Sequence, residues 1–467
     1  MPAPDPGSIT EELALERRRR AADGPGLWRQ YVNPSWAGLL RATGWERRFV
    51  RAQGLELEDD RGERYLDFLS GFGVLGLGHN HPAIKAALRA ALDDDLPGFT
   101  QVECSALAGL AAERLSALLP GGPHRVFFCS SGSEAVEAAI KLARAATGKR
   151  RLVACEGAYH GSTLGALSLK GIGAARDRFG PLLPEVLRIP FGDLEALQRA
   201  ARGGDLAAFV VEPILGEGGT VVPPADFLPR AADAVHAQGG LLVVDEVQTG
   251  LGRTGRMFAF EHAGASPDVV TVAKVLGGGL VPVGAMAARA EAFDRAYGSA
   301  RTCMDHATTF GGGPLAMVAV LATLRVLEEE RLVERADEQG RTLRRKLEDI
   351  AARRSSIREV RGMGLMLGLK FKDAAGGWLD RTPLAAFGQA SAALLAQYVA
   401  LRLLSEHRIV TQAAVNDPSV LKVMPPLTVD GPAIDRFAAA LDAVLADAGH
   451  ASAFARFATE FVRHARG

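Results

Sequence analysis

Between Pro82 and about residue 325, short apolar runs alternate with stretches that have helical spacing, and this alternation restricts the possible folds most strongly. A repeated strand–helix alternation produces a mostly parallel sheet with right-handed crossovers and helices on its faces. We therefore predict an α/β fold with one large, mostly parallel sheet flanked by helices. The runs predicted to be strands are Arg125–Cys129, Arg151–Cys155, Ala207–Val211, Leu241–Val244 and Val269–Ala273.

The segments on either side predict a second, smaller α+β domain. Residues 1 to about 45 have the pattern of a helical arm that breaks at Asp23–Gly26, and Phe49–Phe68 has the pattern of a hairpin turning at Asp59–Gly62. The segment Gly71–Pro82 is too rich in glycine for a regular element. A long helical stretch from Leu315 to about Arg353 follows the sheet region.

The C-terminal part repeats a mixture of strands and helices, and 467 residues favour two domains over one core. We expect a small domain built from both chain ends: residues 1–81 with the arm, a large domain of residues 82–340, and the remainder in residues 341–467. The expected C-terminal elements are the β-type segment Glu359–Phe371, a helix around Ala385–Glu406, strands around Ile409–Gln412 and Leu421–Met424, and a helix from Ala433.

Two of the predicted strands end in side chains that together suit one cofactor. Asp245 follows the run Leu241–Val244, and Lys274 follows the run Val269–Ala273. Ligands bind at the carboxyl ends of strands in open α/β sheets. An amine there can form a Schiff base with a carbonyl, and an acid can hold a protonated pyridine nitrogen. Pyridoxal 5′-phosphate (PLP) needs both partners.

Other predicted strands end in groups that could complete such a site. Ser131-Gly132-Ser133 opens a helix and could bind an anion, or Ser133 could be a simple helix cap. Tyr159 and His160 could stack on a planar ring or pack in the core. Glu217 follows the run Ala207–Val211, and Thr309 in a glycine-rich loop could bind phosphate or cap the next helix. The order of these groups along the chain indicates one cofactor site.

Several other classes of protein are disfavoured. No G-x-G-x-x-G opens the first strand–helix turn, and no G-x-S-x-G elbow is present, so dinucleotide binding and serine hydrolysis lack their motifs. The four cysteines form no C-x-x-C pair, which argues against a metal site and favours a reducing compartment. Net charge is zero and no long uncharged run occurs, so we expect no nucleic acid, no membrane and a cytoplasmic location.

From about Phe68 to Pro426 the chain resembles the class III PLP-dependent aminotransferases. The blocks Leu242–Gly255 and Pro267–Gly279 are the most specific part of the match. The resemblance implies fold type I and a transaminase that moves an amino group between an amine, or its aldehyde, and an oxo acid by a ping-pong mechanism. It also implies a homodimer with shared sites.

The resemblance assigns roles position by position. Lys274 matches the Schiff-base lysine that later moves protons, and Asp245 matches the acid at the pyridine nitrogen. Thr309 matches the threonine that reaches phosphate across the dimer interface. The other matches are Gly132 and Ser133 at the phosphate, Tyr159 stacked on the ring, Val247 beneath it and Gln248 at its phenolic oxygen. Ser131 and His160 are also expected to bind the cofactor.

Within the class, the chain is most similar to putrescine aminotransferases and other diamine or ω-amino enzymes. The stretch Ser70–Val74 carries part of this similarity, and Phe72, Val74, Glu217 and Lys422 are the expected substrate residues. Lys422 stands where relatives commonly have an arginine that binds a substrate carboxylate and pairs with the glutamate at Glu217. A lysine is a point charge without the bidentate fork, which puts dicarboxylate binding in question. Another PLP reaction, as in racemases and aminomutases, and a non-catalytic homologue remain as alternatives.

Overall fold

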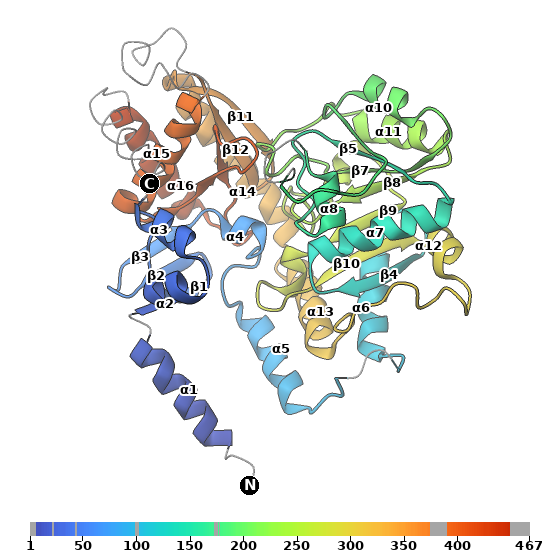
Figure 1. The fold of residues 1–467 in the computed structure, drawn as a ribbon. Helices are drawn as coiled ribbons and strands as arrows, with labels where there is room; N and C mark the ends of the chain where they lie inside the picture. Colours follow the sequence, from blue (N-terminus) through green and yellow to red (C-terminus); the bar gives the residue numbers. More distant parts are fainter. Residues whose placement is uncertain are drawn as a thin grey trace.

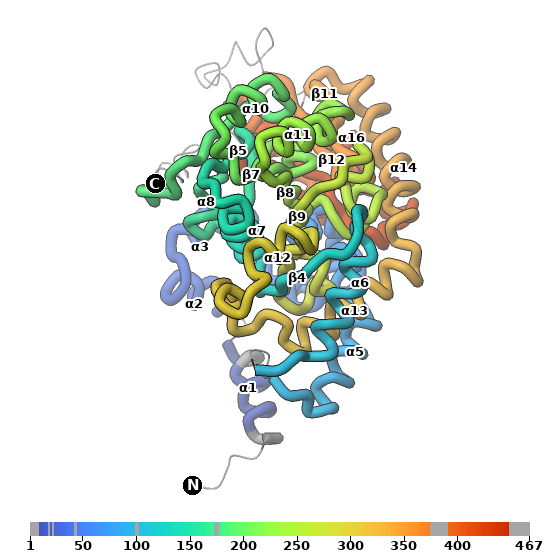
Figure 2. Tube along the Cα trace, turned by 90° about the vertical axis from the view of Figure 1, so that its right-hand side faces the viewer, coloured from blue at the N-terminus to red at the C-terminus, as the bar shows by residue number. Residues whose placement is uncertain are grey.

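A computed structural model describes residues 6–20, 23–42, 44–98, 102–171, 176, 178–373 and 390–448. Figure 1 shows a large sheet with its helices on the right and two smaller sheets with further helices on the left. Near the N-terminus, α1 extends away from the other elements in both views (Figure 2). The helices of this first segment are α1 (Pro6–Arg20), α2 (Gly24–Tyr31) and α3 (Pro34–Ala42).

The large sheet has seven strands in the order β4-β10-β9-β8-β7-β5-β6. All pairs from β9 to β6 are parallel, whereas β10 is antiparallel to both of its neighbours. The predicted α/β fold is confirmed. The strands are β4 (His124–Cys129), β5 (Arg151–Cys155), β6 (Val186–Ile189), β7 (Leu206–Val211), β8 (Leu241–Asp245), β9 (Val269–Val272) and β10 (Gly284–Arg289).

Sequence analysis missed two of these strands. The edge strand β6 is short and only partly buried, and β10 has the composition GAMAAR, which lacks the β-branched residues typical of strands. The central strands β7, β8 and β9 are buried along their whole length, which explains their continuous apolar runs.

Helices cover both faces of the large sheet, and alternate strand residues point to opposite faces. Val243 packs with α7, α8 and α12 on one face, whereas its neighbours Leu242 and Val244 pack with α6, α10, α11 and α13 on the other. The helices of this region are α5 (Pro82–Asp93), α6 (Ala106–Ala117), α7 (Gly132–Thr147), α8 (Leu164–Leu169), α10 (Leu194–Ala201), α11 (Phe227–His236), η2 (Ala259–Ala263), η3 (Lys274–Gly277), α12 (Ala290–Tyr297) and α13 (Pro314–Glu329).

The continuous helix expected from Leu315 to about Arg353 is wrong. The structure has α13 and then α14 (Leu332–Arg353), separated at Arg331, which adopts a left-handed φ of 50°. Hydrophobic spacing continues across this break because both helices bury an apolar face, so periodicity alone could not reveal it.

The predicted hairpin is a three-stranded meander. Its strands are β1 (Phe49–Gln53), β2 (Glu56–Asp59) and β3 (Arg64–Asp67), so the expected turn after Asp59 is present and Gly54 adds a second one. After β3, the glycine-rich segment contains a short turn, α4 (Ser70–Gly73). Gly71 and Phe72 there have left-handed φ values of 57° and 58°, so α4 is not a regular helix.

The two chain ends meet in one sheet, because β13 (Ile409–Val410) pairs in parallel with β3. The predicted helix around Ala385–Glu406 corresponds to α15, and its first residues, 385–389, lie outside the described residues. The division of domains at residues 81 and 340 stays a prediction. The remaining elements are β11 (Ile357–Met363), β12 (Met366–Phe371), α15 (Ala390–His407), β14 (Gln412–Ala413), β15 (Val420–Val423) and α16 (Gly431–Ala448).

Candidate active site

A cavity of about 660 Å³ lies at the carboxyl ends of the strands of the large sheet. Most residues predicted from the sequence line it together, although they come from distant parts of the chain. Those residues are Phe72, Val74, Ser131, Gly132, Ser133, Tyr159, His160, Glu217, Asp245, Val247, Gln248 and Lys274. Lys422 and Thr309 are not among the lining residues.

Lys274 lies two residues after the end of β9 and begins the short helix η3 with a φ of 48°. Burial lowers the pKa of its amine below the ordinary value of 10.5, although the negative charges of Asp245, Glu217 and Glu212 oppose this. The nearby positive charge of Lys422 lowers it further. A lowered pKa makes the neutral, nucleophilic form of the amine more accessible near neutral pH.

Asp245, the last residue of β8, is held by donors from three directions. His160 Nδ1 lies 2.7 Å from its Oδ2, while Val247 N and Thr271 Oγ1 both donate to Oδ1 over 3.0 Å. Burial lowers the pKa of His160, but the hydrogen bond and charge of Asp245 outweigh burial and raise it overall. The contacts stabilise a carboxylate anion, which can hold a cation in the cavity.

The start of α7 provides an anion-binding turn. Its N-cap is Ser131, whose Oγ accepts from Glu134 N over 3.2 Å, so the alternative that Ser133 caps the helix is wrong. Ser133 Oγ instead accepts from Ser162 N. The N–H groups of Gly132 and Ser133 lie in the first turn, where a helix offers no carbonyl partners and its dipole favours an anion.

Gly132 is required by close packing as well as by its position. A Cβ atom at this residue would lie 2.9 Å from Val247 Cγ1 and 3.4 Å from Ala273 Cβ. Since Val247 and Ala273 follow β8 and β9, the absence of a side chain lets the turn approach the residues beside Asp245 and Lys274.

One of the residues that line the cavity, Glu217, forms an ion pair with a fully buried lysine. Lys422 Nζ, fully buried on β15, donates to Glu217 Oε1 and, over 3.2 Å, to Gln248 Oε1. The same ammonium lies 5.5 Å from the centre of the Phe72 ring. Although burial raises the pKa of Glu217, Lys422 and Gln248 lower it below its ordinary value.

Both N–H donors of the Gln248 amide are occupied in this arrangement. Because Lys422 has no acceptor, it must face the amide oxygen of Gln248, and this fixes the orientation of the amide. Gln248 Nε2 donates to Phe72 O over 3.1 Å and to Glu217 Oε1 over 3.2 Å. To donate to a bound ligand, Gln248 must release one of these partners.

Glu212 also lines the cavity, although it was not among the predicted site residues. It is buried after β7 and accepts from Tyr159 N and Gly216 N at 2.9 Å each. Burial raises its pKa to about 7, with a further increase from Asp245 and a decrease from His160. Its position at the end of a strand, like that of Asp245, was the available signal.

Thr309 lies on an exposed loop before α13, together with Phe310, whose side chain is 77% exposed. Tyr159, in contrast, lines the cavity, and its hydroxyl lies 3.1 Å from Ser162 Oγ. Within one chain, the structure therefore brings together all predicted cofactor residues except Thr309.

Comparisons with known proteins identify the family of the chain. The family model for class III aminotransferases matches residues 42–445. The chain is 38% identical to aminotransferase PigE of Serratia sp. over 89% of its length, and it spans about half of that relative, 52%. It is 39% identical to the putrescine aminotransferase of Pectobacterium atrosepticum, covering 86% of this chain and 84% of the relative.

Among solved structures, the ornithine aminotransferase from Toxoplasma gondii, described with PLP at its active site, is similar with a TM-score of 0.76 and 29% identity. That match covers 89% of this chain and 92% of the other. No described helix is long and apolar enough to cross a membrane.

Because the family model matches residues 42–445, the chain belongs to the class III aminotransferase family, whose cofactor is pyridoxal 5′-phosphate.

Proposed function

We propose that the protein is a transaminase that moves an amino group between a terminal primary amine, or its aldehyde, and an oxo acid by a ping-pong mechanism. The observation that carries the proposal is that Lys274, a buried amine with a lowered pKa, shares one cavity with the carboxylate of Asp245. The names of two relatives, putrescine and ornithine aminotransferase, support a terminal amine as donor.

The residues present fit PLP. His160 Nε2 is a buried atom without a partner in the described part of the chain, on the ring that holds Asp245. The turn at Gly132, which a Cβ would fill, suits a phosphate, and Tyr159 and Val247 offer surfaces for a planar ring. The donor set thus provides an anion site, ring contacts, an acid and an amine.

Each side chain has a defined part in the proposed reaction. PLP, when bound, supplies a ring that accepts the electron pair left at the substrate carbon. Asp245, fixed by His160, Val247 and Thr271, keeps a proton on the ring nitrogen through its negative charge. Lys274, once its amine is neutral and free, takes a proton from the substrate carbon and returns it at a neighbouring atom.

The closed pair of Lys422 and Glu217 supports a donor without a carboxylate near the reacting carbon. Lys422 is buried against Glu217, Gln248 and the Phe72 ring, so a substrate carboxylate could reach it only if Glu217 left. A diamine, or an ω-amino compound whose carboxylate does not reach Lys422, needs no such displacement. We infer that these compounds are better donors than α-amino acids.

We also propose a homodimer in which Thr309 completes the phosphate site of a second copy. Thr309 lies on an exposed loop and does not line the cavity of its own chain, although the family resemblance assigns it to phosphate. Refolding a 1:1 mixture of K274A and T309A chains tests this. Shared sites would restore about a quarter of wild-type activity through one intact site in each mixed dimer. If no activity returned, Thr309 would serve its own chain or no site at all.

Absorbance spectroscopy of the holoenzyme tests the reaction. Addition of 1,4-diaminobutane or an ω-amino acid should bleach the band of the Lys274-bound cofactor, and pyruvate or 2-oxoglutarate should restore it. Absence of bleaching would refute the proposed donor class. Interconversion of enantiomers without an oxo acid would indicate a racemase, and inability to retain PLP would indicate a non-catalytic homologue.

A further inference from the structure

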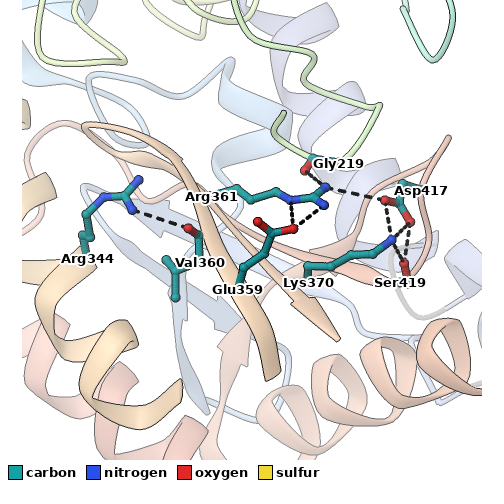
Figure 3. A network of polar contacts seen from close by, with 8 residues as sticks. All are labelled: Gly219, Arg344, Glu359, Val360, Arg361, Lys370, Asp417 and Ser419. Carbon is teal, nitrogen blue, oxygen red and sulfur yellow. Dashed lines mark hydrogen bonds and ion pairs between the residues drawn. The ribbon is translucent and has the colours of Figure 1, made fainter. Parts of the chain in front are cut away.

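A network of charged side chains joins β12 to the loop between β14 and β15 and has no place in the reaction described above (Figure 3). At its centre, Asp417 belongs to the loop between β14 and β15. Lys370 Nζ donates to both of its carboxylate oxygens, at 3.0 and 2.8 Å, and Ser419 Oγ donates to Oδ1 over 2.5 Å. These contacts anchor the loop to β12, which carries Lys370.

The residues directly before Asp417 hold Glu217. Val415 N donates to Glu217 Oε2 over 3.2 Å, and Asn416 N donates to the Glu217 carbonyl over 2.9 Å. Asn416 Nδ2 also donates to Gly157 O over 3.0 Å, close to Tyr159. The loop of residues 414–419 therefore joins the segment of Glu217 to the segment of Tyr159, and Val415 itself lines the cavity.

The network also holds the segment after Glu217. Arg361 Nη1 donates to Gly219 O over 3.3 Å, and its guanidinium forms an ion pair with Glu359 and lies 3.9 Å from Asp417 (Figure 3). Gly219 has a φ of +98°, and a Cβ there would lie 2.9 Å from Asp417 Oδ2. The segment of Glu217 is thus held on one side by the loop that Asp417 anchors and on the other by Arg361, which lies beside Asp417.

This inference rests on the proposed function: we propose that Asp417 and Lys370 are positioning residues that keep Glu217 paired with Lys422 and so weaken the binding of donors whose carboxylate reaches Lys422. Glu217 Oε2 accepts from Val415 N, while Oε1 accepts from Lys422 and Gln248. Without the anchor at Asp417, the loop no longer holds Val415 N against Glu217 Oε2, and Glu217 keeps only the contacts of Oε1 with Lys422 and Gln248. Glu217 then leaves Lys422 more readily. Lys422 then becomes available to a substrate carboxylate.

Two donors of equal chain length, pentylamine and 5-aminopentanoate, measure this effect. In D417N and K370M holoenzymes, the ratio of kcat/KM for 5-aminopentanoate to that for pentylamine should rise about 3- to 10-fold, the effect of losing one hydrogen bond to a charged group. The matched control is D442N, because Asp442 accepts from Arg354 Nε over 2.8 Å and does not line the cavity. Its ratio should equal that of the wild type.

A merely structural role of Asp417 would lower both rates equally and leave the ratio unchanged, and this result would overturn the proposal. Hydrogen exchange followed by mass spectrometry gives a second readout that needs no turnover. The amides of Val415 and Asn416 should exchange faster in D417N holoenzyme than in wild type or D442N, and equal exchange would also overturn it. If neither amine bleaches the wild-type band, the proposed donor class fails, while exchange still decides whether Asp417 positions the loop.

Discussion

The buried pair of Lys422 and Glu217 gives a quantitative prediction for Lys422→Met. The substitution keeps most of the side-chain volume but leaves Glu217, only 6% exposed, without its cation. Removing one partner of a buried ion pair costs about 3–5 kcal/mol. With an unfolding entropy of about 2.1 cal/mol/K per residue, a chain of 467 residues loses about 1 °C of Tm per kcal/mol, so Tm should fall by about 3–5 °C.

The loss of stability in Lys422→Met should be larger at high pH than at low pH. Burial raises the pKa of Glu217, but Lys422 lowers it below its ordinary 4.5, so the wild type gains stability above that pH and loses it as pH falls through the folded pKa. In Lys422→Met only burial and the weaker donors remain, and the pKa of Glu217 rises. The charged form then costs stability at high pH, and the cost decreases as Glu217 becomes protonated.

Differential scanning fluorimetry of the holoenzymes at about pH 8 and pH 5.5 measures the fall in Tm and its dependence on pH. The double variant K422M/E217Q should recover most of the loss at pH 8, since it removes the unpaired charge. The control K346M breaks the exposed pair of Lys346 with Asp435 and should change Tm by no more than about 1 °C. A K422M deficit that is equal at both pH values, or unrelieved in the double variant, would refute the electrostatic reasoning.

Three further predictions concern the cofactor site. Lys274→Ala should retain the fold, measured by circular dichroism, but lose the absorbance band of Lys274-bound cofactor and all turnover, and surviving activity would overturn the site. In the apoenzyme, the rate of recombination with PLP should rise with pH as Lys274 loses its proton and reach half of its plateau below pH 10.5, because burial lowers this pKa; a midpoint at or above 10.5 would contradict it. Gly132→Ala should cost about 1–3 kcal/mol of stability through the contact with Val247, and unchanged Tm and PLP affinity would show that the turn adapts.

The strand–helix alternation was sufficient to predict the large sheet, because fully buried parallel strands must be apolar along their whole length. It was insufficient for β10, where alanines and glycines give no strand signal although the strand lies between β4 and β9. The break at Arg331 was also hidden, since the helices on both sides keep the same apolar spacing.

The candidate site likewise has a part that the sequence predicts and a part that it does not. Asp245, Lys274 and the turn at Gly132 follow directly from their places at the ends of strands and at the start of a helix, which are local properties of the sequence. The sequence also marked Lys422 as unusual. Its state depends on contacts with Glu217, Gln248 and Phe72, which lie far apart in the chain.

The sequence by itself therefore determined the α/β architecture, the family and the residues suited to the cofactor, because periodicity and motifs act over short distances. Only the tertiary structure decided that Lys422 is buried and paired, that Gln248 is occupied, and that Asp417 anchors the loop beside Glu217. Burial and ion pairing arise from residues that meet only when distant segments pack together, so no local pattern could encode them.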